Sequence, residues 1–255
     1  MSTGTAVWRL DLAYDGTPFC GWARQPDRCS VEGELEQALA TVLRERVRLR
    51  VAGRTDAGVH ALAQVASFST ERADLDPERL RLSLNSLLPP EIVVGGVTRA
   101  GHGFDARAAA SRSYRYRLWL PDARPVFERA YVWDVHGGLG FAALQECAPL
   151  FVGHRDFSAL TPSARFYKTC VREIRAASWR RSDDAREAVF EVTGGSFLHN
   201  MVRVMVGTMV DVAQGRLSVA EVARGLDGGA RRALGQTAPP GGLALVAVEY
   251  REESA

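Results

Sequence analysis

The chain has 255 residues, of which 46% are hydrophobic and 24% charged, and its formal net charge is +2. This apolar fraction and the near-balanced charge exclude an intrinsically disordered protein. Charged residues interrupt every apolar run before about 18 residues, so we expect no membrane span. The sequence also begins without a basic stretch followed by an apolar run. It therefore predicts a cytoplasmic globular protein with no secretory signal.

The first half of the chain predicts the element order β-α-β-β-α-β. Alternating hydrophobicity predicts the strands, and Ser30 is a typical N-cap for the first helix. Asp76 and Pro77 predict the start of the second helix, which Pro89 and Pro90 end. The predicted elements are the strands 6–14, 47–51, 64–69 and 92–97 and the helices 31–43 and 77–88.

The second half repeats this order with a further short helix. The predicted elements are the strands 114–119, 171–179, 188–193 and 243–250 and the helices 141–150, 197–213 and 219–226. Each half therefore follows the ferredoxin-like plan, and the predicted fold class is α+β. We expect two domains, 1–105 and 106–255. RNA-recognition proteins share this plan, but it hosts many unrelated functions and indicates RNA binding only weakly.

Neither the cysteines nor the glycine-rich segment predicts a metal or cofactor site. The cysteines, which lack C-x-x-C spacing and a nearby histidine pairing, are Cys20, Cys29, Cys147 and Cys170. This excludes the usual zinc and thioredoxin-like motifs. The segment 101–106 matches G-x-G-x-x-A, but a predicted strand follows where that dinucleotide-binding motif requires a helix. We therefore expect no metal and no cofactor.

Arginine dominates the basic residues, since Lys168 is the only lysine among the 32 Lys and Arg residues. Genome base composition can explain this bias, but arginine also forks onto phosphates and stacks on bases. Arginines at even-numbered positions line the second predicted strand and lead into the loop after it: Arg44, Arg46, Arg48, Arg50 and Arg54. They form either a solvated face or a stripe that contacts phosphates. The small net charge confines any nucleic-acid surface to a local patch.

The segment 53–61, GRTDAGVHA, is the densest group of chemically functional residues in the chain. It lies between two predicted strands, and its glycines permit unusual backbone angles. Arg54, Asp56 and His60 place a guanidinium, a carboxylate and an imidazole within seven positions. Composition alone supports a catalytic loop about as well as a tight loop in which Arg54, Thr55 and Asp56 bind one another.

Arg203 favours the catalytic interpretation. It lies in the predicted helix 197–213, which is apolar nearly all round and therefore buried. An unpaired buried guanidinium costs about 3–5 kcal/mol. Asp211 lies ~12 Å farther along the helix, which is too far for an ion pair. Asp56 is a natural partner, and a structural salt bridge with another acid is the alternative.

The predicted strand 113–117, SYRYR, is the second feature that favours a site. Its tyrosines, Tyr114 and Tyr116, fall on one face and its arginines on the other. A tyrosine face commonly packs in a core. It can also supply one ring on which an extruded base stacks, which is worth ~1–3 kcal/mol.

Several segments of the chain follow one another in the order found in one enzyme family. They are 14–17 (YDGT), 21–25 (GWARQ), 53–60 (GRTDAGVH), 104–107 (FDAR), 113–116 (SYRY), 154–157 (HRDF) and 197–203 (FLHNMVR). By these segments the chain resembles the tRNA pseudouridine synthase A family over essentially its whole length. The resemblance implies a pseudouridine synthase-type antiparallel sheet with a central cleft.

The resemblance implies a cofactor-free isomerisation of uridine to pseudouridine at positions 38, 39 and 40 in the anticodon stem-loop of tRNA. Asp56 is the implied catalytic nucleophile, and attack at ribose C1′ or by another route is left open. Tyr114 is implied to stack on the flipped uracil and to help with proton transfer. Arg203 is implied to pair with Asp56, which favours the ionised carboxylate.

The resemblance also implies how the tRNA is bound. Arg54 is expected to help flip the base. The other expected tRNA contacts are Arg24, Gln25, His60, Arg107 and Arg172. The family is homodimeric, and one tRNA reaches across both subunits. Three positions depart from the family pattern and bear on tRNA contacts rather than on the reaction: Ala23, Asp105 and Gly241.

Two alternatives to an isomerase follow from the same residues. A non-catalytic tRNA-binding or RNA-folding protein would use the same basic cleft, but phosphate binding alone does not need a carboxylate such as Asp56 at the centre. An RNA glycosidase would share the nucleophile and differ only in its product. Base release gives free uracil, whereas isomerisation gives none.

Overall fold

In the computed structural model, which describes residues 5–72 and 74–251, the chain divides into two compact units. Unit 1 comprises Met1–Arg112 with Leu245–Ala255, and unit 2 comprises Ser113–Ala244. Both contain helices and largely antiparallel strands, which confirms the predicted α+β class. The ferredoxin-like plan of each half and the division into 1–105 and 106–255 stay predictions.

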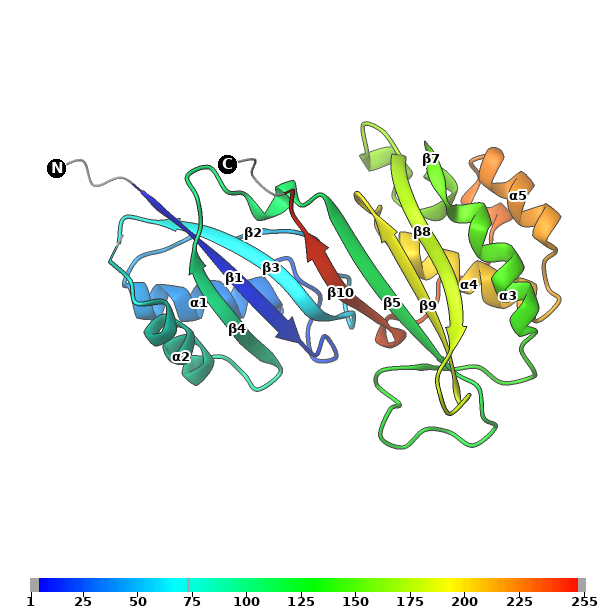
Figure 1. Ribbon diagram of the computed structural model, residues 1–255, viewed down its shortest axis with the longest axis horizontal. Coiled ribbons are helices and arrows are strands. Elements are labelled where there is room, and N and C mark those ends of the chain that lie inside the picture. The colour runs from blue at the N-terminus through cyan, green and yellow to red at the C-terminus, as the bar shows by residue number, and fades with distance from the viewer. Residues whose placement is uncertain (1–4, 73, 252–255) are drawn as a thin grey trace. The chain divides into compact units, whose positions relative to one another are not determined.

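The strands of unit 1 follow the order β4-β1-β3-β10, with β2 paired to β3 (Figure 1). Strand β1 runs antiparallel to both β3 and β4. Helices α1 and α2 contact each other, and α2 packs on β4. The elements are β1 (Ala6–Tyr14), α1 (Val31–Leu43), β2 (Arg50–Val51), β3 (His60–Thr70), α2 (Pro77–Leu87), β4 (Ile92–Arg99), the 3-10 helix η1 (Ala106–Ala108) and the unit 1 part of β10 (Leu243–Glu249).

Local sequence signals account for the helices and the first strand of unit 1. Ser30 Oγ accepts a hydrogen bond from the backbone N–H of Gly33 at 3.3 Å. The Asp76 carboxylate accepts one from the N–H of Arg79 at 2.9 Å. Both predicted N-caps are therefore confirmed. Strand β1 alternates between buried and half-buried residues along its whole length, as the period of two predicts.

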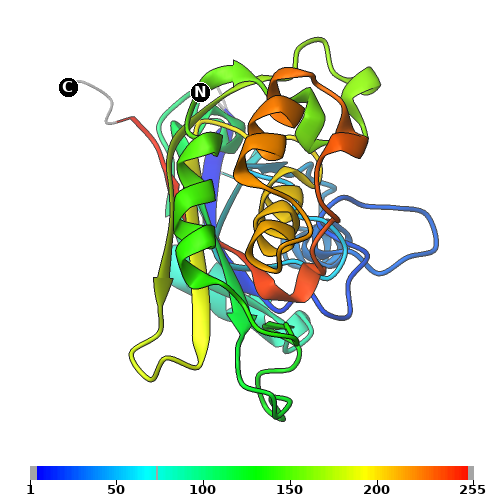
Figure 2. The same cartoon turned by 90° about the vertical axis from the view of Figure 1, so that its right-hand side faces the viewer.

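The strands of unit 2 follow the order β5-β9-β8-β7, and β6 pairs parallel with β5. Helix α3 packs against α4 and α5, and α4 and α5 lie to one side of the strands in Figure 2. The elements are β5 (Ser111–Trp119), β6 (Trp133–Asp134), α3 (Phe141–Cys147), β7 (Gly153–Asp156), β8 (Val171–Arg181), β9 (Glu187–Gly194), α4 (Met201–Ala213) and α5 (Val219–Asp227). Short 3-10 helices connect them: η2 (Ala148–Phe151), η3 (Ser158–Leu160), η4 (Ala164–Phe166), η5 (Arg231–Ala233) and η6 (Pro240–Gly242).

The second predicted strand is mostly wrong. The hydrogen-bonded part is only Arg50–Val51, although the strand was predicted over 47–51. Val47 and Leu49 are buried while Arg46 and Arg48 are exposed. The alternation therefore reports which side chains are buried, not which backbone groups join the sheet. The next strand, β3, starts at His60 and is longer than predicted.

In unit 2, two helix bounds differ from the prediction and two short strands were missed. Helix α4 begins at Met201 rather than at 197, because Asn200 has a left-handed backbone with a φ of 61°. Helix α3 ends at Cys147, and the following 3-10 turn contains Pro149, whose missing N–H cannot continue an α-helix. Strands β6 and β7 have 2 and 4 residues, too few for a periodic signal.

Helices α1 and α4 have 13 residues each, about 20 Å at 1.5 Å per residue. Across 5–72 and 74–251, none of the helices has both the length and the apolarity that crossing a bilayer requires.

Candidate active site

The loop that carries Asp56 connects β2 to β3 in unit 1; residues 53–59 are called the Asp56 loop below. Its backbone and side chains bind the neighbouring segment 14–22. The hydroxyls of Thr55 and Tyr14 lie 2.8 Å apart in a buried hydrogen bond. The backbone N–H of Trp22 donates to the carbonyl oxygen of Thr55 at 3.0 Å. Thr55 is thus held through both its side chain and its backbone, directly beside Asp56.

Gln64 on β3 fixes the start of the same loop. Its Nε2 donates to the Gly53 carbonyl oxygen at 2.7 Å and to the Tyr14 hydroxyl at 3.1 Å. Burial raises the pKa of Tyr14 to about 12, while the hydrogen bonds with Thr55 and Gln64 act in the opposite direction. The Tyr14 hydroxyl therefore stays protonated at neutral pH, and this network under the loop carries no charge.

The end of the Asp56 loop is fixed by His60. The backbone N–H of Gly16 donates to His60 Nδ1 at 3.0 Å, and Asp15 Oδ1 lies 3.1 Å from the same nitrogen. The His60 side chain is buried. At least part of its role is thus to join the loop to the segment after β1. Its predicted contact with tRNA stays a prediction.

Gly21 shows how closely the 14–22 segment approaches the loop. Its backbone has a φ of +106°, a conformation that side-chain-bearing residues rarely adopt. A Cβ at this position would lie 2.8 Å from the carbonyl oxygen of Thr55 and 3.1 Å from the amide nitrogen of Ala57. Only glycine lets the chain pass this close to the residues on both sides of Asp56.

The structure does not support the alternative in which Arg54, Thr55 and Asp56 bind one another. The Thr55 hydroxyl binds Tyr14. The Arg54 side chain is exposed, and within the described part of the chain it forms no hydrogen bond or ion pair. Asp56 is half-buried. The loop therefore presents a cation and a carboxylate from a backbone that other residues hold in place.

In unit 2, the structure fixes Tyr114 by an aromatic contact. Tyr114 lies on β5 and is buried. Its ring packs edge-on against that of Phe197, with ring centroids 5.0 Å apart. Phe197 belongs to the segment that leads into α4, so the contact brings this strand and the approach to the Arg203 helix together.

Arg203 on α4 is held by groups of unit 2. Its Nε donates to the carbonyl oxygen of Ala238 at 2.8 Å, and its Nη1 donates to Asn200 Oδ1 at 2.7 Å. The backbone N–H of Ala238 in turn donates to the Arg203 carbonyl oxygen at 3.0 Å. The next carbonyl, that of Pro239, accepts a hydrogen bond from the Tyr116 hydroxyl at 2.7 Å. The segment 236–239 thereby joins β5 to α4.

Asp211 on the same helix has other partners, in agreement with its distance from Arg203 along the sequence. Its carboxylate accepts hydrogen bonds from Arg216 Nε at 2.9 Å and from the backbone N–H of Gln236 at 3.1 Å. Asp211 therefore also holds the segment 236–239 on α4. Whether Arg203 pairs with Asp56 stays a prediction.

The residues expected to contact tRNA differ in how they are held. Arg24 and Gln25 are exposed in the segment before α1, where Arg24 Nη1 lies 3.5 Å from Glu36 Oε2. Arg107 in η1 forms a close ion pair with Asp105 at 2.6 Å. Arg172 on β8 is half-buried, and its Nη1 donates to the carbonyl oxygens of Thr169 and Val171.

Asp105 also binds a member of the predicted arginine stripe. Arg50 Nη1 lies 3.1 Å from its carboxylate, and hydrogen bonds from Arg107 hold the pKa of Asp105 below its usual value. The prediction that the arginines of this stripe share one face of a strand is wrong. Arg44 is the C-cap of α1 and has a left-handed backbone, and the hydrogen bonds between β2 and β3 begin only at Arg50.

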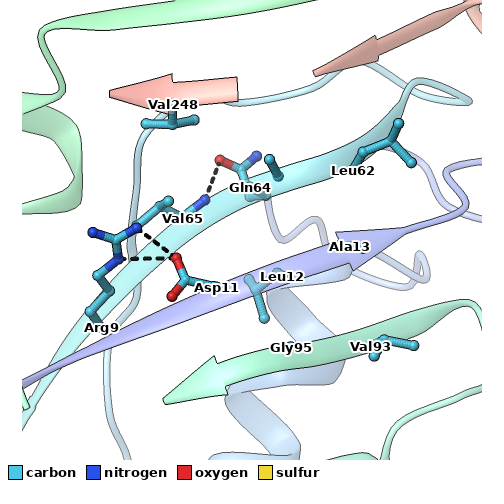
Figure 3. A pocket seen from close by; sticks show the side chains of 11 residues that line it. Arg9, Asp11, Leu12, Ala13, Leu62, Gln64, Val65, Val93, Gly95 and Val248 are labelled. Carbon is cyan, nitrogen blue, oxygen red and sulfur yellow. Dashed lines mark hydrogen bonds and ion pairs between the residues drawn. The ribbon is translucent and has the colours of Figure 1, made fainter. Parts of the chain in front are cut away.

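A depression lies on the sheet of unit 1 (Figure 3). It is lined by β1, β3, β4 and β10, and Arg9 and Asp11 form an ion pair of 2.7 Å on its floor. None of the residues proposed from the sequence for catalysis or tRNA binding lines this depression. Across the residues that the structure describes, no cluster of three or more His, Cys, Asp or Glu side chains could hold a metal ion.

Sequence reasoning missed the residues that support the site. Gln64 is a fully buried amide between Ala63 and Val65 on β3, and a long polar side chain between apolar neighbours is a signal that could have singled it out. For Tyr14, the sequence indicates only the end of the first strand and the start of the YDGT segment, without a role in the site. The segment 236–239 has no periodic pattern, and its role depends on contacts with α4 and β5 that lie far away in sequence.

Comparison with known proteins identifies the family. A family model described as "tRNA pseudouridine synthase" matches residues 12–107 and 147–251. A Geobacter sulfurreducens protein named tRNA pseudouridine synthase A is 41% identical over 243 residues, which cover 95% of this chain and 98% of that protein. A Geotalea daltonii protein of the same name is 40% identical over 243 residues, with the same coverage.

Similarity to solved structures is more distant. The structure titled "Crystal Structure of a Cbf5-Nop10-Gar1 Complex" matches 93% of this chain and 48% of that chain, with a TM-score of 0.38 and 12% identity. These values are too low to support an argument about fold or function. The sequence matches are sufficient by themselves, and the chain belongs to the tRNA pseudouridine synthase family of isomerases.

Proposed function

We propose that this enzyme isomerises uridine to pseudouridine at positions 38, 39 and 40 in the anticodon stem-loop of tRNA, with Asp56 as the nucleophile. The observation that carries the proposal is the Asp56 loop, which neighbouring groups hold through the carbonyls of Gly53 and Thr55 and the Thr55 hydroxyl, with His60 fixed at the start of β3. A carboxylate on a fixed backbone suits a reaction that depends on a near-attack geometry. The names of the relatives support tRNA as the substrate.

The proposed reaction breaks the bond between ribose C1′ and N1 of uracil and forms a bond between C1′ and C5. C5 loses a proton and N1 gains one, so the atoms balance without an oxidant, a reductant or a cofactor. Asp56 would attack either C1′ or the base, and both routes use the ionised carboxylate as the nucleophile. The detached ring must stay bound so that it can rotate before it rejoins the sugar.

Tyr114 and Arg203 would act on the same uridine. The edge-on contact with Phe197 holds the Tyr114 ring, which supports a role as the aromatic face on which the flipped uracil stacks. Tyr114 would also help with proton transfer. The bonds of Arg203 to Ala238 and Asn200 fix its guanidinium. An arginine paired with Asp56 would favour the charged carboxylate.

The remaining predicted residues would bind the tRNA. Arg54 is exposed, and no described acid neutralises it, which supports its role in extruding the uridine. Arg107 would have to share its guanidinium between a phosphate and Asp105, so we expect it to contribute less than Arg54. The other proposed tRNA contacts are Arg24, Gln25, His60 and Arg172.

We also propose that the enzyme is a cytoplasmic homodimer and that one tRNA reaches across both subunits. The same family resemblance supports the central cleft and the two ferredoxin-like halves. Sedimentation of the purified chain with and without tRNA tests the dimer. If the proposal is right, the smallest complex contains two copies of the chain and one tRNA.

Mass-spectrometric mapping of unmodified tRNA transcripts tests the reaction. The purified chain, without added metal or cofactor, is expected to form pseudouridine at positions 38 to 40, whereas Asp56→Ala forms none. Free uracil in the supernatant would contradict the proposal in favour of a glycosidase. Bound but unmodified tRNA would contradict it in favour of a binding protein.

A further inference from the structure

The segment from Arg165 to Arg172 in unit 2 forms a surface of aromatic rings and cations, of which only Arg172 is among the tRNA contacts proposed above. We propose that this surface binds the RNA by stacking an unpaired base of the anticodon loop on Phe166, while neighbouring cations contact the phosphates. The inference rests on the proposed function, because it names a binding surface for the same substrate. The residues concerned are called the Phe166 surface: Arg165, Phe166, Tyr167, Lys168 and Arg172.

Phe166 has the exposure that a stacking platform needs. Its side chain is 74% exposed, far more than a core phenylalanine. The Arg165 guanidinium lies over its ring, 4.7 Å from the ring centroid. A cation held against an aromatic face is attracted by the ring quadrupole and limits its rotation. An exposed ring beside an arginine is the arrangement on which unpaired bases stack.

Tyr167 and Arg172 form a second ring and cation pair next to the first. The Arg172 guanidinium lies 5.6 Å from the centroid of the Tyr167 ring. Two backbone carbonyl oxygens accept hydrogen bonds from Arg172 Nη1, at 2.7 and 3.0 Å. These bonds fix the guanidinium over the ring before any ligand arrives. Little side-chain freedom is then lost on binding.

Hydrogen bonds hold the Phe166 surface as a preformed element. Backbone N–H groups of Phe166 and Tyr167 close the 3-10 turn η4 on the carbonyls of Ser163 and Ala164. The Tyr167 hydroxyl accepts a hydrogen bond from the backbone N–H of His199 at 3.0 Å. The Ser163 hydroxyl and His199 Nδ1 lie 2.9 Å apart. The surface is thus joined to the segment that leads into α4.

This connection places the surface close to the proposed catalytic residues of unit 2. His199 is two residues from Phe197, a separation of at most about 7 Å along the chain. Phe197 packs directly against Tyr114. A base stacked on Phe166 would therefore belong to a nucleotide near the flipped uridine rather than to a distant arm of the tRNA.

The charge of the surface favours RNA over an apolar partner. Arg165 and Lys168 are exposed, and Lys168 is the only lysine in the chain. Hydrogen bonds from Ser158, and to a smaller extent the charge of Arg172, lower the pKa of the nearby Asp156 carboxyl. The charged residues of the Phe166 surface itself are all cations, namely Arg165, Lys168 and Arg172. Phosphates are the anions that such a surface attracts when it also offers a ring to a base.

Binding of a fluorescein-labelled anticodon stem-loop RNA, followed by anisotropy, tests the proposal with the full-length protein. Phe166→Ala is expected to weaken binding by roughly 5- to 150-fold, the range that one lost base–aromatic stack produces. Phe166→Trp is expected to bind as tightly as the natural protein. In turnover of tRNA the loss should appear in KM. An unchanged affinity for Phe166→Ala would overturn the proposal.

Two controls separate stacking from other effects. Phe127 is 86% exposed in the same unit, so Phe127→Ala removes an equally exposed ring and is expected to leave affinity unchanged. A fully paired RNA duplex has no free base to stack, so Phe166→Ala is expected to bind it as the natural protein does. An equal loss of affinity with Phe127→Ala, or an equal loss on the duplex, would overturn a specific stacking site.

The outcomes also separate this surface from the proposed reaction. If Phe166→Ala loses affinity for the stem-loop but the natural protein forms no pseudouridine, the surface stands and the isomerisation proposal fails. If the natural protein forms pseudouridine and Phe166→Ala binds as tightly as the natural protein, the isomerisation stands and the surface fails.

Discussion

The Asp56 loop and helix α4 hold their proposed catalytic residues in different ways. Around Asp56, hydrogen bonds hold Gly53 and Thr55 of the loop and His60 at the start of β3, which bind Gln64, Tyr14 and Gly16 respectively. On α4, the guanidinium of Arg203 is itself an anchor, because it binds the carbonyl of Ala238 and the side chain of Asn200. The backbone around Asp56 is thus held through other residues of the loop, whereas the Arg203 side chain itself holds the segment 236–239.

Because of this difference, we expect substitutions in the loop to separate activity from stability, and substitutions of Arg203 to change both. In the loop, a change of the reacting group should leave the scaffold intact, and a change of the scaffold should lower stability first. In α4, removal of Arg203 should lower both together. Four substitutions test this comparison, beginning with the one that should cost most.

Arg203→Ala should have the largest combined effect. It removes charge-assisted hydrogen bonds to Ala238 and Asn200, which are worth roughly 1.5–3 kcal/mol each. We expect pseudouridine formation to fall about 10²-fold or more, as for the loss of a fixed charged donor, together with a lower urea midpoint. Arg203→Lys should restore neither the activity nor the stability, because one ammonium group cannot reproduce the planar set of donors of a guanidinium. An unchanged midpoint for Arg203→Ala would show that the guanidinium is not an anchor.

Gly207→Ala tests the segment 236–239, which packs on α4 and binds Arg203 through Ala238. A Cβ at Gly207 would clash with the carbonyl oxygen of Gln236, which packs on α4 at this position. The segment 236–239 would have to shift, at a cost of about 1–3 kcal/mol in the free energy of unfolding. Pseudouridine formation should fall as well, since Ala238 holds Arg203. A variant that is as stable as the natural protein would contradict the close packing.

Tyr14→Phe tests the loop scaffold through its pH dependence. The pKa of Tyr14 is raised from 10.0 to about 12, so the folded protein keeps this proton to a higher pH than the unfolded chain does. The resulting stability is complete below about pH 10 and is lost as the pH rises toward 12. Tyr14→Phe should cost about 1–2 kcal/mol at neutral pH through the lost hydrogen bonds.

Urea unfolding at pH 8, 10 and 11 measures this effect. The other tyrosines are present in both proteins, so the difference between the curves isolates Tyr14. The natural protein should lose stability more steeply above pH 10 than the variant does. Parallel pH dependence in the two proteins would mean that the Tyr14 hydroxyl does not bear the raised pKa.

Arg54→Ala should have the smallest effect on stability, below about 0.5 kcal/mol, because its side chain is exposed. Its effect should appear in tRNA binding. We expect weaker affinity and a salt dependence whose slope falls by about one, as for the loss of one phosphate contact. A large loss of stability would show that Arg54 belongs to the scaffold of the loop.

Local signals explain which parts of the fold could be predicted. Ser30 and Asp76 act as N-caps within their own first turns, so the starts of α1 and α2 can be read from a few residues. The start of α4 could not, because the left-handed backbone of Asn200 interrupts an apolar pattern that continues through it. The two-residue strands β2 and β6 depend on the neighbours that they pair with, and such neighbours are not encoded locally.

The candidate site shows the same limit. Asp56 stood out because an arginine, a carboxylate and an imidazole gather in one glycine-rich loop. Gln64 and Tyr14 did not, because their hydrogen bonds under the loop join residues as far as 50 positions apart in sequence. Sequence motifs therefore identified the proposed reacting groups, whereas the groups that hold them became visible only in the structure.

Single-turnover formation of pseudouridine by Asp56→Asn tests whether the Asp56 carboxylate is the nucleophile. The substitution keeps the size of the side chain and the scaffold of the loop but removes the nucleophilic charge. With tRNA bound in advance to excess protein, we expect tRNA affinity and the unfolding midpoint to stay close to those of the natural protein. The single-turnover rate of pseudouridine formation should fall by at least about 10³-fold, as for other lost nucleophiles. Pseudouridine formed by Asp56→Asn at a rate near that of the natural protein would contradict the account.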